Sequence, residues 1–269
     1  MSLGVVIKGP EGIVLACDSR VTLTATKEGS PSLIVNYDNA TKLLSLAAPH
    51  NYVAAVTYGI AVIGLRTAHS FIPEFEVELE ESKDRLTMLD FANKLSKFYL
   101  TQWKKAYPEE ANIPPMVFIV GGYDPGDAYG KVYQFDIPYK PDPIEQNPGE
   151  ENFGMTWGGQ LDIASRIIHG YDPNLLLILQ KELNLSKEQV AHLTKKLMET
   201  LEFSIPYQIL PLQDCIDLAT FMIRTTINGQ NLAVGIRGVG GPIDVAIVTK
   251  TNGLQYIQKK TIKISENRI

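Results

Sequence analysis

The chain has 269 residues, of which 45% are hydrophobic and 20% are charged, so it holds enough apolar material for one large folded domain. Its formal net charge is -5 and no block of Lys and Arg stands out, which argues against a nucleic-acid partner. No stretch reaches the roughly 18 unbroken apolar residues of a membrane span, and no basic flank precedes a hydrophobic signal region. We therefore expect a cytoplasmic protein that binds neither nucleic acid nor a membrane.

The N-terminal part predicts strands, because short apolar segments alternate with turn residues there. These segments are Leu3–Lys8, Gly12–Asp18, Ser32–Val35, Lys42–Ala47 and Tyr52–Tyr58. A three-residue loop from Gly9 to Glu11 would make a hairpin of the first two and pair Lys8 with Gly12. The same register places Ser2 opposite Asp18, with both side chains on one face.

The middle of the chain mixes both periodicities. Helices are expected from Gly59 to about Ile72 and from Ser82 to Tyr107, and the second carries a broad apolar stripe. Strands return at Met116–Gly121 and Lys131–Asp136, on either side of a turn-rich segment that indicates a hairpin. A proline-rich loop is expected from Pro138 to Pro148.

The remaining sequence predicts helices and a closing strand pair. The helices are Gln160–His169, Pro173–Leu183, Ser186–Leu201 and Pro211–Ile227. Ser186 and Gln189 have the spacing of a capping box, which marks a helix start. The strands Ile243–Thr249 and Gly253–Ile257 are joined across an Asn-Gly pair that suits a tight turn.

This order of elements differs from the alternation of a doubly wound parallel sheet. It favours an α+β fold in which two antiparallel sheets face each other. The helices 59–72 and 82–107 are then expected on one outer surface and the later helices on the other. We expect residues 1–269 to form a single domain, with an extra helical block at about 172–210.

Two cysteines, Cys17 and Cys215, lie far apart in apolar patterns. Isolated thiols of this kind are typical of small buried hydrophobic residues rather than of a disulfide framework or a zinc site. We expect neither a metal nor a cofactor.

Four sequence blocks resemble, in order, the blocks of proteasome-type β subunits of the N-terminal nucleophile (Ntn) hydrolase family. They are Gly12 to Thr22, Lys42 to Leu46, Phe118 to Asp124 and Gly240 to Thr249. The chain resembles a divergent bacterial or archaeal member over nearly its whole length, except for the extra helical block. The resemblance implies the four-layer αββα sandwich of these hydrolases.

The resemblance also implies a catalytic set of Ser2, Asp18 and Lys42. Counting back from Asp18 without a gap, Ser2 takes the place of the family's N-terminal nucleophile, and a small second residue permits removal of Met1. The freed α-amine, with an ordinary pKa of about 8, can accept the proton of the hydroxyl on its own residue. Lys42 falls where the family has a lysine that tunes this pair by its charge, and Asp18 would hold that lysine in place.

The sequence departs from the family pattern around these residues. Trp157-Gly158-Gly159 stands where the family has a serine followed by glycine, and Ile236 to Val239 stands where it has a further aspartate and serine. Ser19 or Thr22 could supply a nearby hydroxyl. The oxyanion-stabilising N–H falls at Val56, or near Gly59 if the register slips.

The function expected from the resemblance is a peptidase that cleaves peptide or unfolded protein substrates through an acyl-enzyme on Ser2, within a homo-oligomeric ring. The four histidines are scattered and carry no motif of a Ser-His-Asp triad. Any ATP-dependent unfoldase must be a separate protein, because the chain has no Gly-rich phosphate loop. Two alternatives stay open: a non-catalytic structural subunit of such a ring, and an amide ligase or transpeptidase using the same acyl-enzyme. The lack of an N-terminal extension favours the enzyme.

Overall fold

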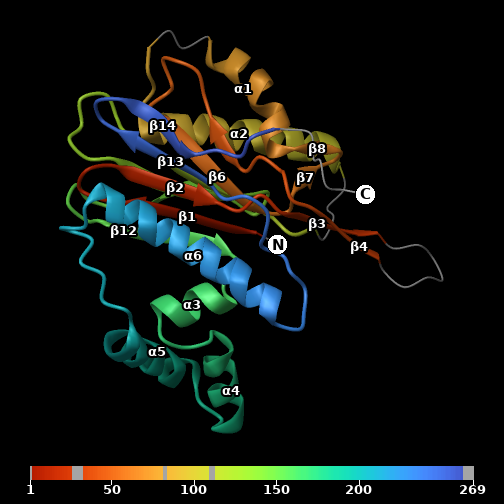
Figure 1. The fold of residues 1–269 in the computed structure, drawn as a ribbon, viewed down its shortest axis with the longest axis vertical. Coiled ribbons are helices and arrows are strands. Elements are labelled where there is room, and N and C mark those ends of the chain that lie inside the picture. The colour runs from red at the N-terminus through yellow and green to blue at the C-terminus, as the bar shows by residue number, and fades with distance from the viewer. Residues whose placement is uncertain (1, 26–32, 81–83, 109–112, 263–269) are drawn as a thin grey trace.

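The computed structural model describes residues 2–25, 33–80, 84–108 and 113–262. Met1, and the ends of the predicted strand and helix at Ser32 and Ser82, lie outside these residues. Two five-stranded sheets dominate the described part of the chain, and every strand pair in them is antiparallel, as expected (Figure 1).

The first sheet has the strand order β12-β1-β2-β13-β14. Its strands are β1 (Leu3–Lys8), β2 (Ile13–Cys17), β12 (Gly154–Gly159), β13 (Asp244–Thr249) and β14 (Gly253–Gln258). Every residue of β1 and β2 is buried, because apolar side chains fill both faces of these inner strands. The start of the chain therefore lies inside the sheet.

The second sheet has the order β11-β10-β9-β6-β5. Its strands are β5 (Leu43–Ser45), β6 (Val53–Gly59), β9 (Met116–Gly122), β10 (Lys131–Ile137) and β11 (Lys140–Gln146). Side chains of the two sheets meet in a shared core, in which Val6 and Leu15 pack with Val56 and Ile119. The sheets therefore face each other directly.

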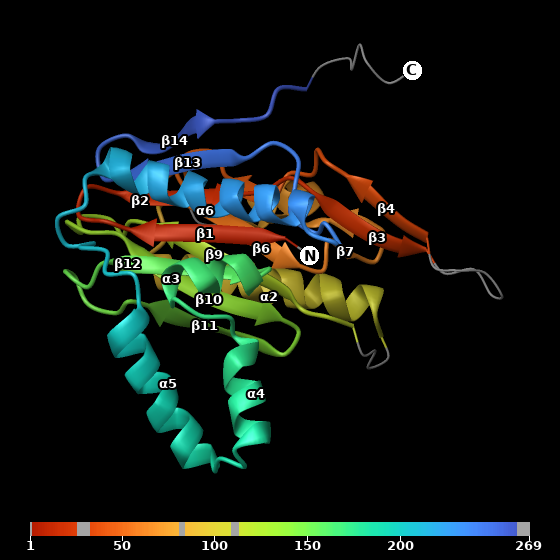
Figure 2. The same ribbon diagram turned by 60° about the horizontal axis from the view of Figure 1, so that its bottom comes forward.

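Helices cover the outer face of each sheet. The 3-10 helix η1 (Ala68–Phe71), α1 (Ile72–Leu79) and α2 (Met88–Ala106) pack on the second sheet in one apolar cluster. On the other side, α3 (Asp162–Ile168) and α6 (Leu212–Leu232) pack on the first sheet in a separate cluster. Figure 2 shows α6 lying across β1 and β2.

Two helices depart from the expected arrangement. We expected all the later helices on one outer surface, but α4 (Asn174–Glu182) and α5 (Lys187–Leu201) project away from the sheets as a helical arm (Figures 1 and 2). The two helices contact each other, and neither contains a buried residue. The predicted capping box of Ser186 and Gln189 is present at the start of α5.

The segment after β6 was wrongly predicted as a helix from Gly59 to Ile72. A small hairpin of β7 (Val62–Ile63) and β8 (Arg66–Thr67) and the 3-10 helix η1 follow β6 instead, and α1 begins only at Ile72. Gly59 has a positive φ of 91°, a conformation that an α-helix does not contain. Another unpredicted strand, β3 (Val21–Ala25), pairs with β4 (Leu33–Tyr37) in a hairpin that extends from the body (Figure 2).

The proline-rich segment from Pro138 to Pro148 was predicted as a loop, but most of it is strand β11. Pro141 and Pro143 fit there because β11 is at the edge of its sheet, where a missing N–H breaks no ladder. Strand β12 was also missed, since its sequence contains three glycines. Both cysteines are free and buried, as expected.

No helix in the described residues is long and apolar enough to cross a membrane.

Candidate active site

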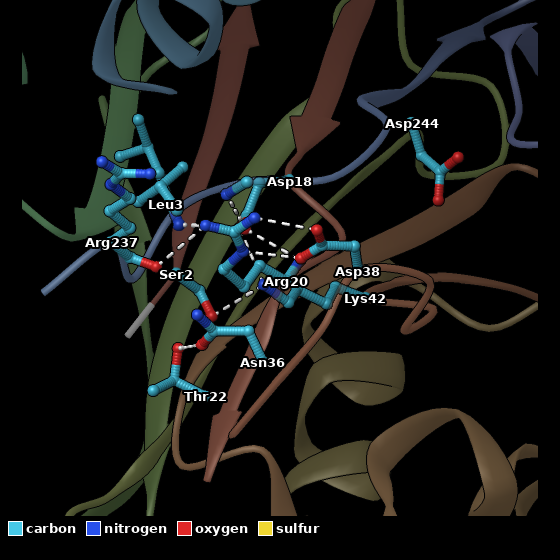
Figure 3. Close-up of polar contacts among 12 residues, drawn as sticks. Ser2, Leu3, Asp18, Arg20, Thr22, Asn36, Asp38, Lys42, Arg237 and Asp244 are labelled. Atoms are coloured by element: carbon cyan, nitrogen blue, oxygen red, sulfur yellow. Dashed lines mark hydrogen bonds and ion pairs between the residues drawn. The ribbon is translucent and has the colours of Figure 1, made fainter. Parts of the chain in front are cut away.

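Ser2, Asp18 and Lys42 lie together at one end of the space between the two sheets. The ammonium of Lys42 donates to the hydroxyl of Ser2, with Nζ 2.8 Å from Oγ, and to the carboxylate of Asp18, with Nζ 2.7 Å from Oδ1 (Figure 3). The three residues are 5%, 0% and 6% exposed, in that order along the chain. The two polar contacts of Lys42 therefore form away from bulk water.

The ends of three strands bring these residues together. Ser2 directly precedes β1, and the alternation of side chains along that strand points it to the same face as Gly4 and Val6, toward the second sheet. Asp18 directly follows β2, and Lys42 directly precedes β5, the edge strand of the second sheet. The hydroxyl thus comes from one sheet and the ammonium from the other.

The register of the first hairpin differs by one residue from the prediction. Lys8 pairs with Ile13 rather than with Gly12, because the loop has four residues and closes with a 2.9 Å bond from the Gly9 N–H to the Gly12 carbonyl. Asp18 is consequently opposite Leu3 and not Ser2. The long side chain of Lys42 spans the resulting offset and contacts both Ser2 and Asp18.

Asp18 organises the site through both of its oxygens. Its Oδ1 accepts from the Leu3 N–H at 3.0 Å besides Lys42, and its Oδ2 accepts from the N–H groups of Arg20 and Gly240, each at 3.0 Å. Four donors satisfy this fully buried carboxylate, as a buried charge requires. The direction of the Lys42 ammonium is fixed as a result.

Arg20 and Gly240 form a supporting layer that the sequence did not predict. The Arg20 guanidinium makes a bidentate pair with Asp38, at 2.6 and 2.8 Å, and this hydrogen bonding raises the pKa of Arg20. A third bond at 3.1 Å joins Arg20 to the carbonyl of Arg237. A Cβ on Gly240 would be only 2.4 Å from Cζ of Arg20, so a larger residue there would displace the guanidinium.

The two hydroxyls considered from sequence do not contact Ser2. Thr22 Oγ1 donates to the side-chain oxygen of Asn36 at 2.9 Å (Figure 3). The Ser19 hydroxyl is buried and has no hydrogen-bond partner among the described residues.

The two segments that depart from the family pattern contact the site through their backbones. Gly159 pairs with Leu3, and the neighbouring Gln160 N–H donates to the carbonyl of Ser2 at 2.8 Å. Arg237 offers its carbonyl to Arg20, while the Val239 N–H donates to the side chain of Gln230 at 2.9 Å. Backbone groups of these segments thus support the site without the side chains that the family has there.

A small pocket opens beside Ser2 and Lys42. Its other walls come from residues 40 and 41 before β5, the end of β6 and the hairpin that follows, with Thr57, Tyr58 and Ala61 among them. Burial raises the pKa of Tyr58 to about 12, so its hydroxyl stays protonated at neutral pH. A reacting group in this pocket would lie next to the Ser2 hydroxyl.

Val56 and Gly59 were considered as oxyanion donors, and among the described residues strand pairing leaves only one of their two N–H groups without a hydrogen bond. The bond from Ile60 N–H to the Pro115 carbonyl sets the alternation along β6 and β9, which directs the Val56 N–H into the sheet toward Ile119. The Gly59 N–H points the other way, past the end of β5, and no hydrogen bond from a described residue uses it. Gly59 is therefore the position with an N–H to offer.

The described residues contain no group of three or more His, Cys, Asp and Glu side chains placed to hold a metal ion. None of the four histidines contacts Ser2 within the described part of the chain.

Two stacked antiparallel sheets with outer helices, and a buried Ser-Lys-Asp cluster between them, define a mixed α/β protein with a candidate nucleophile site. Among solved structures, the chain is similar to Anbu (ancestral beta-subunit) from Yersinia bercovieri, with a TM-score of 0.54 and 14% sequence identity. The match covers 96% of this chain and 88% of that one, so the fold is shared over nearly the full length. Neither a family model nor a curated protein matches the sequence.

Proposed function

We propose that this chain is a proteasome-like Ntn peptidase in which Ser2, once Met1 is removed, is the nucleophile. The hydrogen bond from the Lys42 ammonium to the Ser2 hydroxyl is the observation that carries the proposal. The fold shared with Anbu, whose name describes a beta-subunit, agrees with the resemblance to proteasome-type β subunits. On this proposal the helices and sheets form the αββα sandwich of Ntn hydrolases.

The proposed chemistry follows from the groups around Ser2. The freed α-amine takes the hydroxyl proton while Oγ attacks the substrate carbonyl, and the Lys42 ammonium stabilises the developing alkoxide. The Gly59 N–H is the proposed donor to the oxyanion of the tetrahedral intermediate. Collapse releases the amine product, which carries the transferred proton, and water then hydrolyses the ester on Ser2.

Intact mass and an active-site probe test this proposal. The mature protein should lack one methionine, and a peptide epoxyketone should add to Ser2, because its ring product uses both the hydroxyl and the adjacent amine. A β-lactone should acylate the same hydroxyl. Ser2→Ala should abolish labelling and Ser2→Thr should keep it. Retained Met1 in folded, active protein would refute the role of the amine.

The second candidate is a non-catalytic subunit of a ring, which the fold likeness to a protein named as a subunit supports equally well. It becomes the better proposal if Met1 is absent, no probe reacts and Ser2→Ala changes nothing. An amide ligase or transpeptidase would label in the same way as a peptidase, but would pass the acyl group to an added amine faster than to water.

A further inference from the structure

A second hollow, of about 310 Å³, lies where the edges of the two sheets come together. Strand β12 and helix α3 form one wall, with Met155, Trp157 and His169. The other wall belongs to the second sheet and carries the side-chain amides of Gln134 and Gln146. The hollow therefore has both apolar and polar lining residues, and it runs along the edge strand β12.

The hydrogen-bond pattern shows which backbone groups of β12 face this hollow. The bond from the Gln160 N–H to the Ser2 carbonyl marks one bonded pair, and bonded pairs recur at every second residue of an antiparallel ladder. Thr156 and Gly158 therefore bond to β1, while the N–H and C=O groups of Met155 and Trp157 point outward from the sheet. No hydrogen bond from a described residue reaches these outward groups.

One side chain that lines the hollow also lacks a hydrogen-bond partner in the described part of the chain. The Nδ1 atom of His169 is buried and has no hydrogen-bond partner among the described residues. The imidazole lies against the ring of Trp157, with a centroid distance of 5.4 Å, which holds it at the wall. A ligand with its own donors and acceptors would satisfy both this nitrogen and the strand edge.

Tyr58 connects the hollow to the candidate active site. Its hydroxyl accepts a 3.3 Å hydrogen bond from Gln134, which lines the hollow, while the same residue lines the pocket beside Ser2. A Cβ on Gly158 would be 2.1 Å from this hydroxyl, so Tyr58 lies directly against β12. The far end of β12 reaches Gly159, which pairs with Leu3 next to Ser2.

We propose that this hollow binds a stretch of the substrate polypeptide in extended conformation, added as a further strand to the free edge of β12. Main-chain hydrogen bonds to Met155 and Trp157 would supply affinity that does not depend on sequence, as in other cases of strand addition. The amides of Gln134 and Gln146 then favour polar side chains. This inference rests on the proposed function, and what it adds is the place where the chain binds, at the edge of β12.

Binding can be tested without catalysis in the full-length Ser2→Ala protein. The probe is a pentapeptide of Thr, Val and Gln with blocked ends. It is N-methylated at alternate residues, so that only one edge of the extended peptide keeps N–H groups for pairing and the peptide does not form sheets with itself. The control is the same peptide methylated at every residue. Only the first should bind, and it should slow hydrogen exchange at the Met155 and Trp157 amides by at least about tenfold. Thr156 and Gly158 should not change, because they already bond to β1.

Three results would overturn the inference: equal binding of both peptides, no binding of either at millimolar concentration, or protection at other amides instead. Protection of Met155 and Trp157 in the protein alone, rising with protein concentration, would show that a second copy occupies the edge. Because Ser2→Ala carries no hydroxyl, these outcomes are independent of probe labelling in the unmodified protein, which tests the proposed function.

A variant pair adds a second test. Trp157→Pro removes one outward N–H, which an edge strand tolerates, and should weaken binding of the open peptide about tenfold or more. Trp157→Phe keeps the N–H and an aromatic ring, and should bind nearly as well as the parent. If Trp157→Pro fails to fold, the two peptides still decide the question.

Discussion

Asp18 is the residue on which the geometry of the site depends. Its carboxylate receives three backbone N–H groups besides the ammonium of Lys42. The backbone donors stay in place when the lysine is removed, so the buried charge keeps partners in a Lys42 variant. The proposed role of Lys42 in reactivity can therefore be tested separately from its contribution to stability.

Lys42→Ala should therefore lose most activity while the protein stays folded. Removing one positioned group of a catalytic set typically costs about a hundredfold or more in rate, and Asp18→Asn should cost somewhat less, since an amide still accepts hydrogen bonds. Peptidase assays and thermal melting of both variants are the measurements. If both variants melt and cleave like the parent, the assignment of Lys42 and Asp18 is wrong.

For these residues, the sequence predicted that Lys42 lies beside both Ser2 and Asp18, as it does, but not the strand register. Blocks around Asp18 and Lys42 point to them, while the pairing of Ser2 with Asp18 was wrong by one residue because Gly12 belongs to the loop. Arg20 and Gly240 were missed as a pair, since residues so far apart in sequence show no mutual signal. Their contact depends on the close approach of a guanidinium to a backbone that has no Cβ.

Among the elements, β12 has the strictest local requirements. Gly159 ends this strand at a φ of 109°, and a Cβ there would be 1.9 Å from the carbonyl oxygen of Ser2. Gly126 has a similar φ of 92° but nothing within 4 Å of such a Cβ. A substitution at either glycine would incur the strain of a positive φ, but only a substitution at Gly159 would also collide with the backbone of Ser2.

Gly159→Ala should therefore displace Ser2 and abolish labelling by the epoxyketone, whereas Gly126→Ala should label normally. Each change places a side chain at positive φ, which costs about 1–2 kcal/mol. In chemical denaturation Gly159→Ala should lose more stability than Gly126→Ala, because its Cβ also meets the Ser2 carbonyl. Normal labelling of Gly159→Ala would show that the Ser2 carbonyl can move without harm.

Sequence patterns predicted the inner strands and the edge strands β5 and β14, but they missed the edge strands β11 and β12. Strands β1, β2, β6 and β9 are long apolar runs, and such runs are distinctive whatever surrounds them. Strands β11 and β12 contain prolines and glycines, which are acceptable only where one side of the strand is unpaired. Whether a segment is at an edge depends on the tertiary fold, and so local patterns do not contain that information.

For the whole molecule, the helical arm of α4 and α5 is the main unexplained surface. Neither helix contains a buried residue, and apolar side chains are exposed on the arm, with Leu177 and Ile178 64% and 56% exposed. The sequence predicted both helices, but not that they project from the sheets. An amphipathic helix has the same sequence periodicity whether it packs on a sheet or on another helix.

We expect the protein to assemble, as the resemblance to ring-forming β subunits implies. Exposed apolar surface of this kind is typical of interaction sites. Sedimentation over a range of micromolar concentrations should show species larger than the 29.8 kDa chain, with little change on moderate dilution. A monomer throughout that range would count strongly against a ring.

The burial of β1 on both faces also fixes the position of Ser2. Chain ends usually fray at little cost in free energy, but Ser2 is followed at once by a strand that cannot leave without opening the sheet between β12 and β2. Ser2, the proposed nucleophile, therefore shares the stability of the whole domain. In increasing denaturant, loss of reactivity should coincide with global unfolding rather than precede it, which is the reverse of what a site on a surface loop would show.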